Sequence, residues 1–296
     1  MNQTQVAQNI SAELKALYPF QTKKIKLKSG HTLSTVDEGQ GPVVVLLHGN
    51  PTWSFFYRNL IQTLKKNHRV IAPDHLGMGL SDKPQDYDYC LDHHVENLKE
   101  LLDQLDVKEF SMVVHDWGGA IGFSVAVDRP QALKKAVIMN TAAFPSPVIP
   151  FRINICRHKV FGEKIIRGLN GFAWPATFMA VKKPLSTLVK KGYLFPYDSY
   201  QNRIATARFV QDIPMKKSHP SFERLQKTGN SLASLKVPKL ILWGEKDFCF
   251  NGEFLKEWQS VYPEAKVKTY PEAGHYLIED ETTDVCQQID QFLAVR

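Results

Sequence analysis

The sequence lacks both a long hydrophobic segment and a cysteine framework. Its longest dense apolar run, Val43–Leu47, is far shorter than the roughly 18–20 residues of a membrane-spanning helix. Residues 1–14 have neither the basic start nor the apolar segment of a signal peptide. The four cysteines are widely spaced, and no two of them form a C-x-x-C pair. These absences predict a cytoplasmic protein with reduced thiols, and they exclude a disulfide-stapled fold and a zinc ribbon.

Motifs for metal ions and phosphate groups are missing as well. No two histidines stand in an H-x-x-x-H or H-E-x-x-H pattern. His93 and His94 are adjacent in a predicted helix, so their side chains point apart. The sequence also has no glycine-rich phosphate loop. We therefore expect a protein that works without a metal ion or another cofactor.

Basic residues are abundant but unevenly placed. The chain has a net charge of +7, and residues 151–192 alone hold nine Lys or Arg and a single acid, Glu163. A nucleic-acid-binding protein usually combines such charge with a recognisable reader module, and none is seen, so nucleic acid is not an expected partner. We interpret the basic segment as a solvated helical face. The alternative is a patch that contacts an acidic partner or a membrane surface.

Short apolar strands alternate with helical segments over much of the chain. Lys23–Lys28 and Thr32–Asp37 flank Ser29-Gly30 in a hairpin signature. Continuous apolar runs then predict strands that are buried on both faces. These predicted strands are Val43–His48, Arg69–Pro73, Phe110–His115, Ala136–Asn140, Pro238–Trp243 and Ala265–Tyr270. The alternation predicts an α/β fold with a mostly parallel sheet flanked by helices.

The alternation stops after Thr141. Residues 145–232 are rich in Pro, Lys and aromatic residues and contain helical pieces but no clear strand. We interpret them as a helical cap inserted after a core strand, over the carboxyl ends of the strands, where ligands bind in such sheets. The predicted organisation is a mobile N-terminal lead-in at 1–21, a core at 22–144 and 233–296, and the cap at 145–232.

The strongest local signal is the string Val113–Gly119. It joins a buried strand to a helix by a sharp turn, which is the context of the nucleophile elbow, normally G-x-S-x-G. Asp116 stands where serine would, Gly118 keeps the second small position, and Val114 replaces the first glycine. Taken alone, the string fits equally well an aspartate that caps the following helix.

Three further placements favour a catalytic elbow. Asp247 and His275 each follow a later strand, so nucleophile, acid and histidine occur in the order that this mechanism uses. Asn50 follows the first buried strand, where the second oxyanion donor belongs. Taken alone, His275 would also fit a loop histidine whose ring only forms hydrogen bonds with its surroundings. A non-catalytic binding scaffold has no need for the complete set, so the combination favours an enzyme.

An aspartate nucleophile suits displacement at a carbon atom. A carboxylate is ionised at pH 7, attacks without help from a base, and becomes an ester. Water activated by His275 can then attack that ester, while Asp247 orients the imidazole. The backbone N–H groups of Trp117 and Asn50 would hold the oxyanion. The indole of Trp117 and the amide of Asn50 would also suit a departing halide or carboxylate.

The chain resembles the haloalkane dehalogenase family of α/β-hydrolases over roughly residues 20–294. No acid stands at residues 140–144, just after the fourth core strand, whereas Asp247 and Asn50 are present. This combination is similar to the third subfamily. The matching motifs are His48–Thr52, Asp74–Asp82 and His115–Gly118.

The resemblance implies an α/β-hydrolase that acts on a small apolar substrate. It implies that Asp116, His275 and Asp247 form the catalytic triad. It also implies that Asn50 and Trp117 bind the leaving halide. The reaction would pass through a covalent alkyl-enzyme ester that water then hydrolyses.

Strings in the cap resemble the β-lactone decarboxylases of bacterial long-chain olefin synthesis, which overlap with the third subfamily. A β-lactone has a strained C–O bond whose leaving group is a carboxylate, so the same donors would suit it, with loss of CO₂ in place of halide. Dehalogenation is the main interpretation and decarboxylation to a cis-olefin is the alternative. The matching strings are Asn140–Phe144, Gly192–Leu194, Pro196–Ser199, Asn202–Thr206 and Arg208–Pro214.

An epoxide hydrolase is a less favoured alternative. Such enzymes add two cap tyrosines, and Tyr193, Tyr197 and Tyr200 are present in this cap. Asn50, in place of the bulky residue usual there, argues against this activity, and the cap aromatics are expected to serve in packing. Trp174 is expected to have a core or lid role, the alternative being a second anion donor from the cap.

Overall fold

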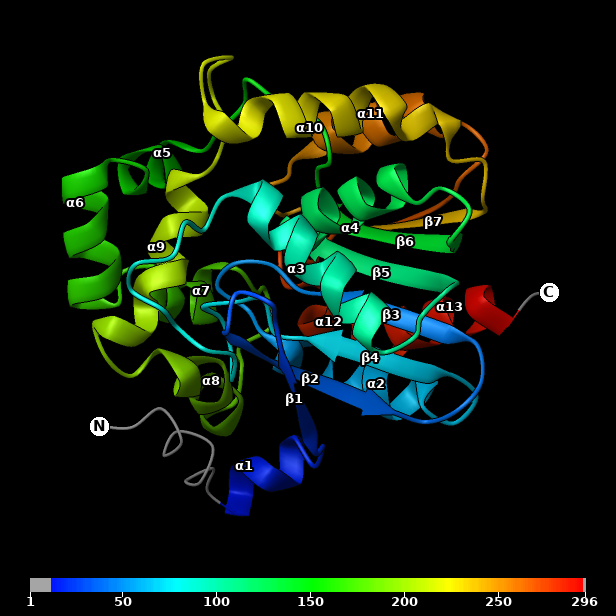
Figure 1. Cartoon of the computed structure of the whole chain (residues 1–296), viewed down its shortest axis with the longest axis horizontal. Helices are drawn as coiled ribbons and strands as arrows, with labels where there is room; N and C mark the ends of the chain where they lie inside the picture. The colour runs from blue at the N-terminus through cyan, green and yellow to red at the C-terminus, as the bar shows by residue number, and fades with distance from the viewer. Residues whose placement is uncertain (1–11, 295–296) are drawn as a thin grey trace.

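An eight-stranded sheet forms the centre of the molecule (Figure 1). The computed structural model describes residues 12–294. The strands are β1 (Thr22–Lys26), β2 (Thr32–Glu38), β3 (Val43–Leu47), β4 (Arg69–Pro73), β5 (Phe110–Asp116), β6 (Leu133–Thr141), β7 (Lys239–Gly244) and β8 (Lys266–Tyr270). Their order in the sheet is β1-β2-β4-β3-β5-β6-β7-β8. The strands from β3 to β8 in the chain are parallel to one another, and β1 and β2 form antiparallel pairs at one edge. The predicted α/β-hydrolase fold is confirmed.

Continuous apolar sequence accounts for the buried centre of the sheet. β3 reads Val-Val-Val-Leu-Leu and is buried at all positions but the first, and every residue of β7 is buried. Strands covered by helices on both faces have no side that must be polar. β6 begins at Leu133 rather than at Ala136 as predicted. Lys134 and Lys135 interrupt the apolar run on which that prediction depended.

Helices cover both faces of the sheet. They are α2 (Arg58–Leu64), α3 (Leu91–Gln104), α4 (Trp117–Asp128), α10 (Pro220–Ser231), α11 (Gly252–Val261), α12 (Leu277–Asp280) and α13 (Thr282–Ala294). α3, α4 and α10 contact one another, and α3 and α4 lie in front of the sheet in Figure 1. α2 and α13 pack together on the other face. Within residues 12–294, no helix is long and apolar enough to cross a bilayer.

A group of short helices separates β6 from β7. They are α5 (Phe151–Cys156), α6 (Lys159–Glu163), a π-helical turn (Lys164–Gly168), α7 (Ala173–Met179), α8 (Thr187–Leu194) and α9 (Ile204–Gln211). In Figure 1 they stand together at the left of the sheet. The bounds 145–232 for a cap stay a prediction, and α10, which falls inside them, packs on α3 and α4.

The N-terminal segment differs from the predicted mobile lead-in. Residues 1–11 of that prediction lie outside the described residues, but Ala12–Leu17 form helix α1, which contacts α8. Leu14 and Tyr18 are buried, and the Tyr18 hydroxyl lies 2.6 Å from Ser54 Oγ. Apolar residues four positions apart share one face of a helix, and this pair anchors the segment to the core.

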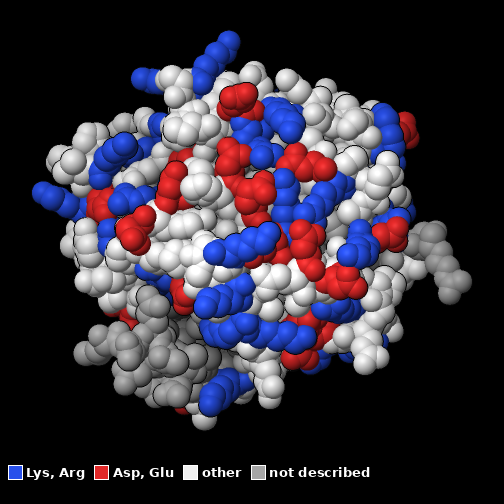
Figure 2. Space-filling view, in the orientation of Figure 1, with Lys and Arg blue, Asp and Glu red and all other residues white. Residues whose placement is uncertain are grey.

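Charges of both signs are mixed on the face that carries α3 and α10 (Figure 2). Arg224 of α10 lies 2.5 Å from Asp92 of α3 and 2.8 Å from Asp128 of α4. Lys99 also pairs with Asp128 at 2.5 Å. Basic and acidic groups thus pair with each other across α3, α4 and α10.

Candidate active site

Asp116 stands at a sharp turn between β5 and α4. Its backbone has φ 50° and ψ −125°, a conformation that L residues adopt at a local cost in energy. The turn also requires close packing of the surrounding backbone. A Cβ on Gly118 would collide with Leu47 O, and a Cβ on Gly49 would collide with the Asp116 carboxylate. The predicted elbow geometry is therefore present, and it directs the carboxylate of Asp116 away from the sheet.

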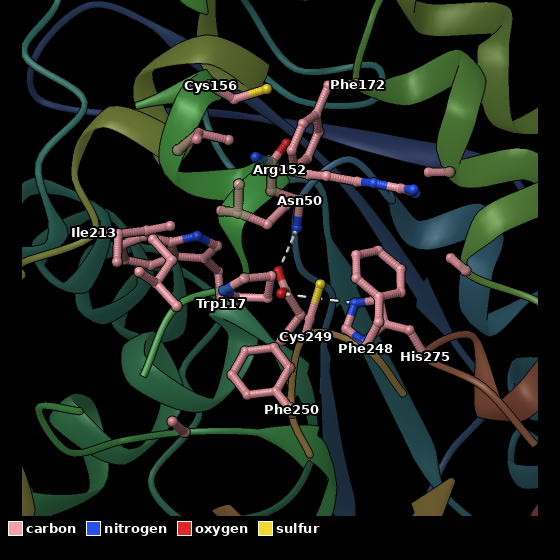
Figure 3. Close-up of a pocket in the computed structure, with 18 of the residues that line it drawn as sticks. Asn50, Trp117, Arg152, Cys156, Phe172, Ile213, Phe248, Cys249, Phe250 and His275 are labelled. Carbon is pink, nitrogen blue, oxygen red and sulfur yellow. Dashed lines mark hydrogen bonds and ion pairs between the residues drawn. The ribbon is translucent and has the colours of Figure 1, made fainter. Parts of the chain in front are cut away.

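Asp116, His275 and Asp247 form one line of polar contacts. His275 Nδ1 lies 2.8 Å from Asp247 Oδ2, and His275 Nε2 lies 3.7 Å from Asp116 Oδ2. Figure 3 shows the second contact as a dashed line. His275 and Asp247 are both buried. The imidazole is thus placed between two carboxylates, as the sequence predicts.

Asn140 fixes the orientation of Asp247, and the sequence analysis did not assign it this role. Its Nδ2 donates to Asp247 Oδ2 at 3.0 Å and to Gly244 O at 3.0 Å. Its Oδ1 accepts from Gly244 N at 2.9 Å. The other carboxylate oxygen of Asp247 accepts from Cys249 N at 2.6 Å. Asn140 has a positive φ of 34°, which Asn tolerates better than most residues.

Two backbone N–H groups point at the Asp116 carboxylate. Asn50 N donates to Asp116 Oδ1 at 2.7 Å, and the N–H of Trp117 also donates to this carboxylate. The side-chain amide of Asn50 donates to Thr206 O of α9 at 3.0 Å, so Asn50 also links the site to the cap. The indole Nε1 of Trp117 forms no hydrogen bond within residues 12–294. It remains available to an anion in the cavity.

The electrostatics of the site follow from burial and from the two carboxylates. Burial raises the pKa of Asp116, while His275 and the N–H groups of Asn50 and Trp117 oppose the shift. Burial lowers the pKa of His275, but Asp247 and Asp116 outweigh it, so the net pKa is raised. The His275 imidazolium is therefore stabilised, as a base that takes a proton from water requires.

Further buried histidines surround the site in neutral form. Burial lowers the pKa of His48 to about 4 and lowers the pKa values of His75, His94 and His115 as well. His115 Nε2 hydrogen-bonds to His275 O at 2.8 Å. These rings position backbone and neighbouring side chains, and they add no charge near neutral pH.

A cavity of about 290 Å³ opens above Asp116. Asn50, Trp117 and His275 lie at its inner end together with Asp116, and apolar side chains form most of the rest (Figure 3). Such a lining suits an apolar substrate whose reacting carbon meets Asp116. Cap residues in the lining include Val148, Arg152, Ile153, Phe172, Met179 and Ile213.

The cap aromatics fall into different roles. Tyr193 donates to Glu279, Tyr197 donates to Thr52 O at 3.2 Å, and Tyr200 is exposed. None of these three tyrosines lines the cavity, which argues against an epoxide hydrolase. Trp174 is 56% exposed, which contradicts the core part of its expected core or lid role and leaves the lid role a prediction. Trp174 does not line the cavity either, so nothing places it as an anion donor.

One group of potential metal ligands lies outside the cavity. Ligand atoms of Asp88, Cys90 and His93 lie within 4.8 Å of one another. His93 Nδ1 is engaged with Asp88 O at 2.7 Å, and burial raises the pKa of Cys90 to about 11. A metal ion requires the thiolate form of cysteine, which this environment disfavours. The group gives no reason to assign a metal.

Comparisons with known proteins identify the family to which this fold belongs. Residues 42–155 match the family model described as the alpha/beta hydrolase fold. The chain is 43% identical to a cis-3-alkyl-4-alkyloxetan-2-one decarboxylase of Shewanella oneidensis, over 95% of this chain and 90% of the relative. It is 39% identical to the decarboxylase of the same name from Xanthomonas campestris pv. campestris, over 93% of this chain and 97% of the relative.

Dehalogenases are more distant relatives in sequence but share the architecture. The chain is 31% identical to haloalkane dehalogenase 2 of Mycobacterium tuberculosis, over 89% of this chain and 92% of the relative. The crystal structure of haloalkane dehalogenase DbeA from Bradyrhizobium elkani superimposes with a TM-score of 0.87 at 25% identity, over 93% of this chain and 98% of that chain. The chain therefore belongs to the haloalkane dehalogenase family of α/β-hydrolases, together with the decarboxylases that it resembles.

Proposed function

We propose that this protein is a β-lactone decarboxylase that uses Asp116 as its nucleophile. The observation that carries the proposal is the 43% and 39% identity to two cis-3-alkyl-4-alkyloxetan-2-one decarboxylases, against 31% to a dehalogenase. The apolar cavity above Asp116 supports a substrate that bears alkyl groups. The wide spacing of the four cysteines, with no C-x-x-C pair, supports the proposal of a cytoplasmic location.

The first step opens the lactone ring. A carboxylate oxygen of Asp116 attacks the saturated, alkyl-bearing ring carbon that is bonded to the ring oxygen. The bond between this carbon and the ring oxygen then breaks. An ester to Asp116 forms with inversion at this carbon, and the ring oxygen leaves as part of a carboxylate. The indole N–H of Trp117 and the Asn50 amide would stabilise the negative charge that develops on this leaving group.

The second step releases both products. The bond between the new carboxylate and its neighbouring carbon breaks, and CO₂ departs. The freed electron pair forms the C=C bond as the ester C–O bond breaks, which regenerates the Asp116 carboxylate. Inversion followed by anti elimination keeps the two alkyl groups cis. No water is consumed, so His275 and Asp247 serve here to keep the nucleophile oriented and ionised.

Dehalogenation is the second candidate, and the 31% identity to haloalkane dehalogenase 2 of Mycobacterium tuberculosis supports it. Asp116 would displace halide, and His275 would activate water to hydrolyse the alkyl ester. His275→Ala with a bromoalkane should then give one burst of bromide and an enzyme heavier by the alkyl group. A His275→Ala enzyme that keeps turning over bromoalkanes would contradict this assignment.

The two candidates are distinguished by their products. Purified enzyme is given a cis-3,4-dialkyl β-lactone and, separately, a panel of bromoalkanes. We expect olefin and CO₂ from the lactone at a higher kcat/KM than alcohol from any bromoalkane. Alcohol without olefin would leave dehalogenation as the function, and no turnover of either class would support a non-catalytic scaffold.

Asp116→Asn tests the nucleophile in both reactions. The amide has nearly the same shape but does not attack carbon, so turnover should be lost while the fold is kept. Asp106→Asn is the matched control, because Asp106 also has a positive φ, of 53°, but lies on the surface away from the cavity. Mass spectrometry of the variant excludes deamidation back to Asp.

A further inference from the structure

The outer surface of the cap exposes most of the large apolar side chains that are exposed on the described chain. Of eleven such side chains in residues 12–294, eight lie between residues 148 and 178. Single exposed apolar residues are normal on soluble proteins, but a concentration of them marks an interaction surface. We call these eight residues the apolar cap face: Val148, Phe151, Ile155, Val160, Phe161, Leu169, Trp174 and Phe178.

Two helices of this surface are apolar on both sides. On α5, Phe151 is 78% exposed while Ile153 lines the cavity. On α7, Trp174 and Phe178 are exposed while Met179 lines the cavity. A helix that only covers a cavity normally presents a polar side to water. The outer sides of α5 and α7 therefore fit a medium that is less polar than water.

The helices of the apolar cap face are neighbours. α5 contacts α6, and Arg152 Nη1 on α5 lies 3.9 Å from Met179 Sδ on α7. Figure 1 shows α5 and α6 at the outer left of the molecule, and α7 in the same group of short helices, nearer to the sheet. The rings of Trp174 and Phe178 contact each other at 5.0 Å between centroids. The exposed residues thus belong to one region of the surface.

Uncompensated cations are interspersed with these apolar residues. Arg152, Lys159 and Lys164 are exposed and form no ion pair within residues 12–294. Glu163, the acid of this region, is engaged by Arg167 at 2.5 Å and by Arg208 at 2.7 Å. The region therefore presents positive charge that no ion pair within the described residues compensates.

We propose that the apolar cap face docks on an anionic lipid bilayer. Aromatic and aliphatic side chains would enter the boundary between headgroups and acyl chains, and the cations would meet anionic headgroups. Charge and exposed apolar area together fit this occupant better than the solvated helical face that the sequence favoured. A bilayer also adapts to side chains on several short helices, without a partner of matched shape.

Docking would bring the cavity to the lipid. Val148 and Arg152 both belong to this exposed region and line the cavity, so the cavity reaches the surface there. An alkyl-substituted substrate dissolved in the bilayer would then enter without crossing water. This last step rests on the proposed function, whereas the docking itself does not.

Co-sedimentation with vesicles tests the docking without any substrate. The full-length protein is mixed with vesicles of phosphatidylcholine alone or of phosphatidylcholine with phosphatidylglycerol. We expect binding to the anionic vesicles that weakens as salt is raised, and little binding to the neutral ones. Absence of binding to anionic vesicles at low salt would overturn the proposal.

Paired variants assign the binding to the cap. Lys159→Gln/Lys164→Gln should weaken vesicle binding about fivefold per cation, on the order of 25-fold for the pair. Phe151→Ser/Phe161→Ser should weaken it roughly tenfold or more. Lys266→Gln/Val267→Ser is the matched control, because β8 also exposes a cation beside an apolar residue, at the far edge of the sheet. Equal binding by cap and control variants would overturn the proposal.

A further measurement separates lipid from protein as the occupant. If the cap variants dissociate an oligomer of this chain in solution and leave vesicle binding unchanged, the face is a protein interface and the proposal is wrong. Phe151 and Phe161 do not line the cavity, so their variants should keep normal kcat/KM on a short, water-soluble substrate. They should lose rate only on substrate presented in anionic vesicles. Loss of all activity with intact vesicle binding would count against the proposed function alone.

Discussion

Asn140 and Asp247 are joined by a hydrogen bond of 3.0 Å, to the same carboxylate oxygen that receives His275 Nδ1. The amide of Asn140, at the end of β6, therefore helps to orient the Asp247 carboxylate toward His275. Asn140 is a positioning residue, because it touches neither the cavity nor Asp116. Removal of the Asn140 side chain should therefore lower kcat, through the orientation of Asp247 and His275, more than it changes substrate binding.

Asn140→Gly tests this relationship. Glycine accepts the positive φ but lacks the amide, so the backbone is kept while Asp247 loses a donor. A hydrogen bond to a charged group stabilises by about 1.5–3 kcal/mol, so kcat should fall on the order of 10- to 100-fold with KM little changed. The check is a steady-state comparison with wild type. A rise in KM at constant kcat would contradict a positioning role.

Trp117→Phe keeps the aromatic ring and removes the N–H donor. Loss of one such donor typically costs on the order of 10²–10³ in rate, so the bond-breaking step should slow by this factor for lactone and bromoalkane alike. Rapid-quench measurement of that step is the test. Trp243→Phe is the matched control, because its Nε1 is buried and has no partner within residues 12–294. A wild-type rate for Trp117→Phe would rule out anion binding by the indole.

The pH dependence of bromoalkane turnover reports on His275. Hydrolysis of the ester needs neutral imidazole, and activity is lost as pH falls through the pKa of His275. Asp247 raises this pKa, and its charge persists after Asp116 is esterified. The acid limb of kcat should therefore lie at a higher pH than it would without the Asp247 charge. Asp247→Asn should shift that limb to lower pH, and an unshifted limb would contradict the assigned role.

Asp280 should contribute to stability by tying the His275 loop to the cap. Its Oδ1 accepts from Lys182 N and Lys183 N at 2.8 Å each, and its Oδ2 accepts from Gly274 N at 2.7 Å. Asp280→Ala leaves these donors without an acceptor, and we expect a loss of about 3 kcal/mol in the free energy of unfolding.

Glu281→Ala is the neighbouring control for Asp280→Ala. Its exposed pair with Lys183 should contribute about 1 kcal/mol or less. Urea unfolding measures both changes. Equal losses for the two variants would show that Asp280 does not anchor the cap.

The sequence predicts features that depend on local pattern. Apolar runs located the parallel strands because a strand covered on both faces shows no polar alternation. The order of Asp116, Asp247 and His275 predicted a shared site, because the carboxyl ends of parallel strands meet at one edge of the sheet. The structure brings these three side chains together, and their catalytic roles stay predictions.

Features that depend on contacts between distant residues were not predicted. Asn140 is ordinary in the sequence, and only the approach of β7 to β6 gives its amide a partner. Trp174 was expected to have a core or lid role, and only the structure shows that its side chain is exposed beside Phe178. The sequence likewise did not predict that Arg167 is buried in an ion pair with Glu163, because a run of charges does not show which of them will pair.

The central claim is that Asp116 opens a β-lactone and is regenerated by loss of CO₂ without water. It is tested by turning over a cis-3,4-dialkyl β-lactone in ¹⁸O-labelled water and analysing the product and the peptide that contains Asp116. The account predicts cis-olefin, CO₂ and an unlabelled Asp116 after many turnovers, with no product from Asp116→Asn. A 3-hydroxy acid together with ¹⁸O in Asp116, or olefin formed at an unchanged rate by Asp116→Asn, would contradict it.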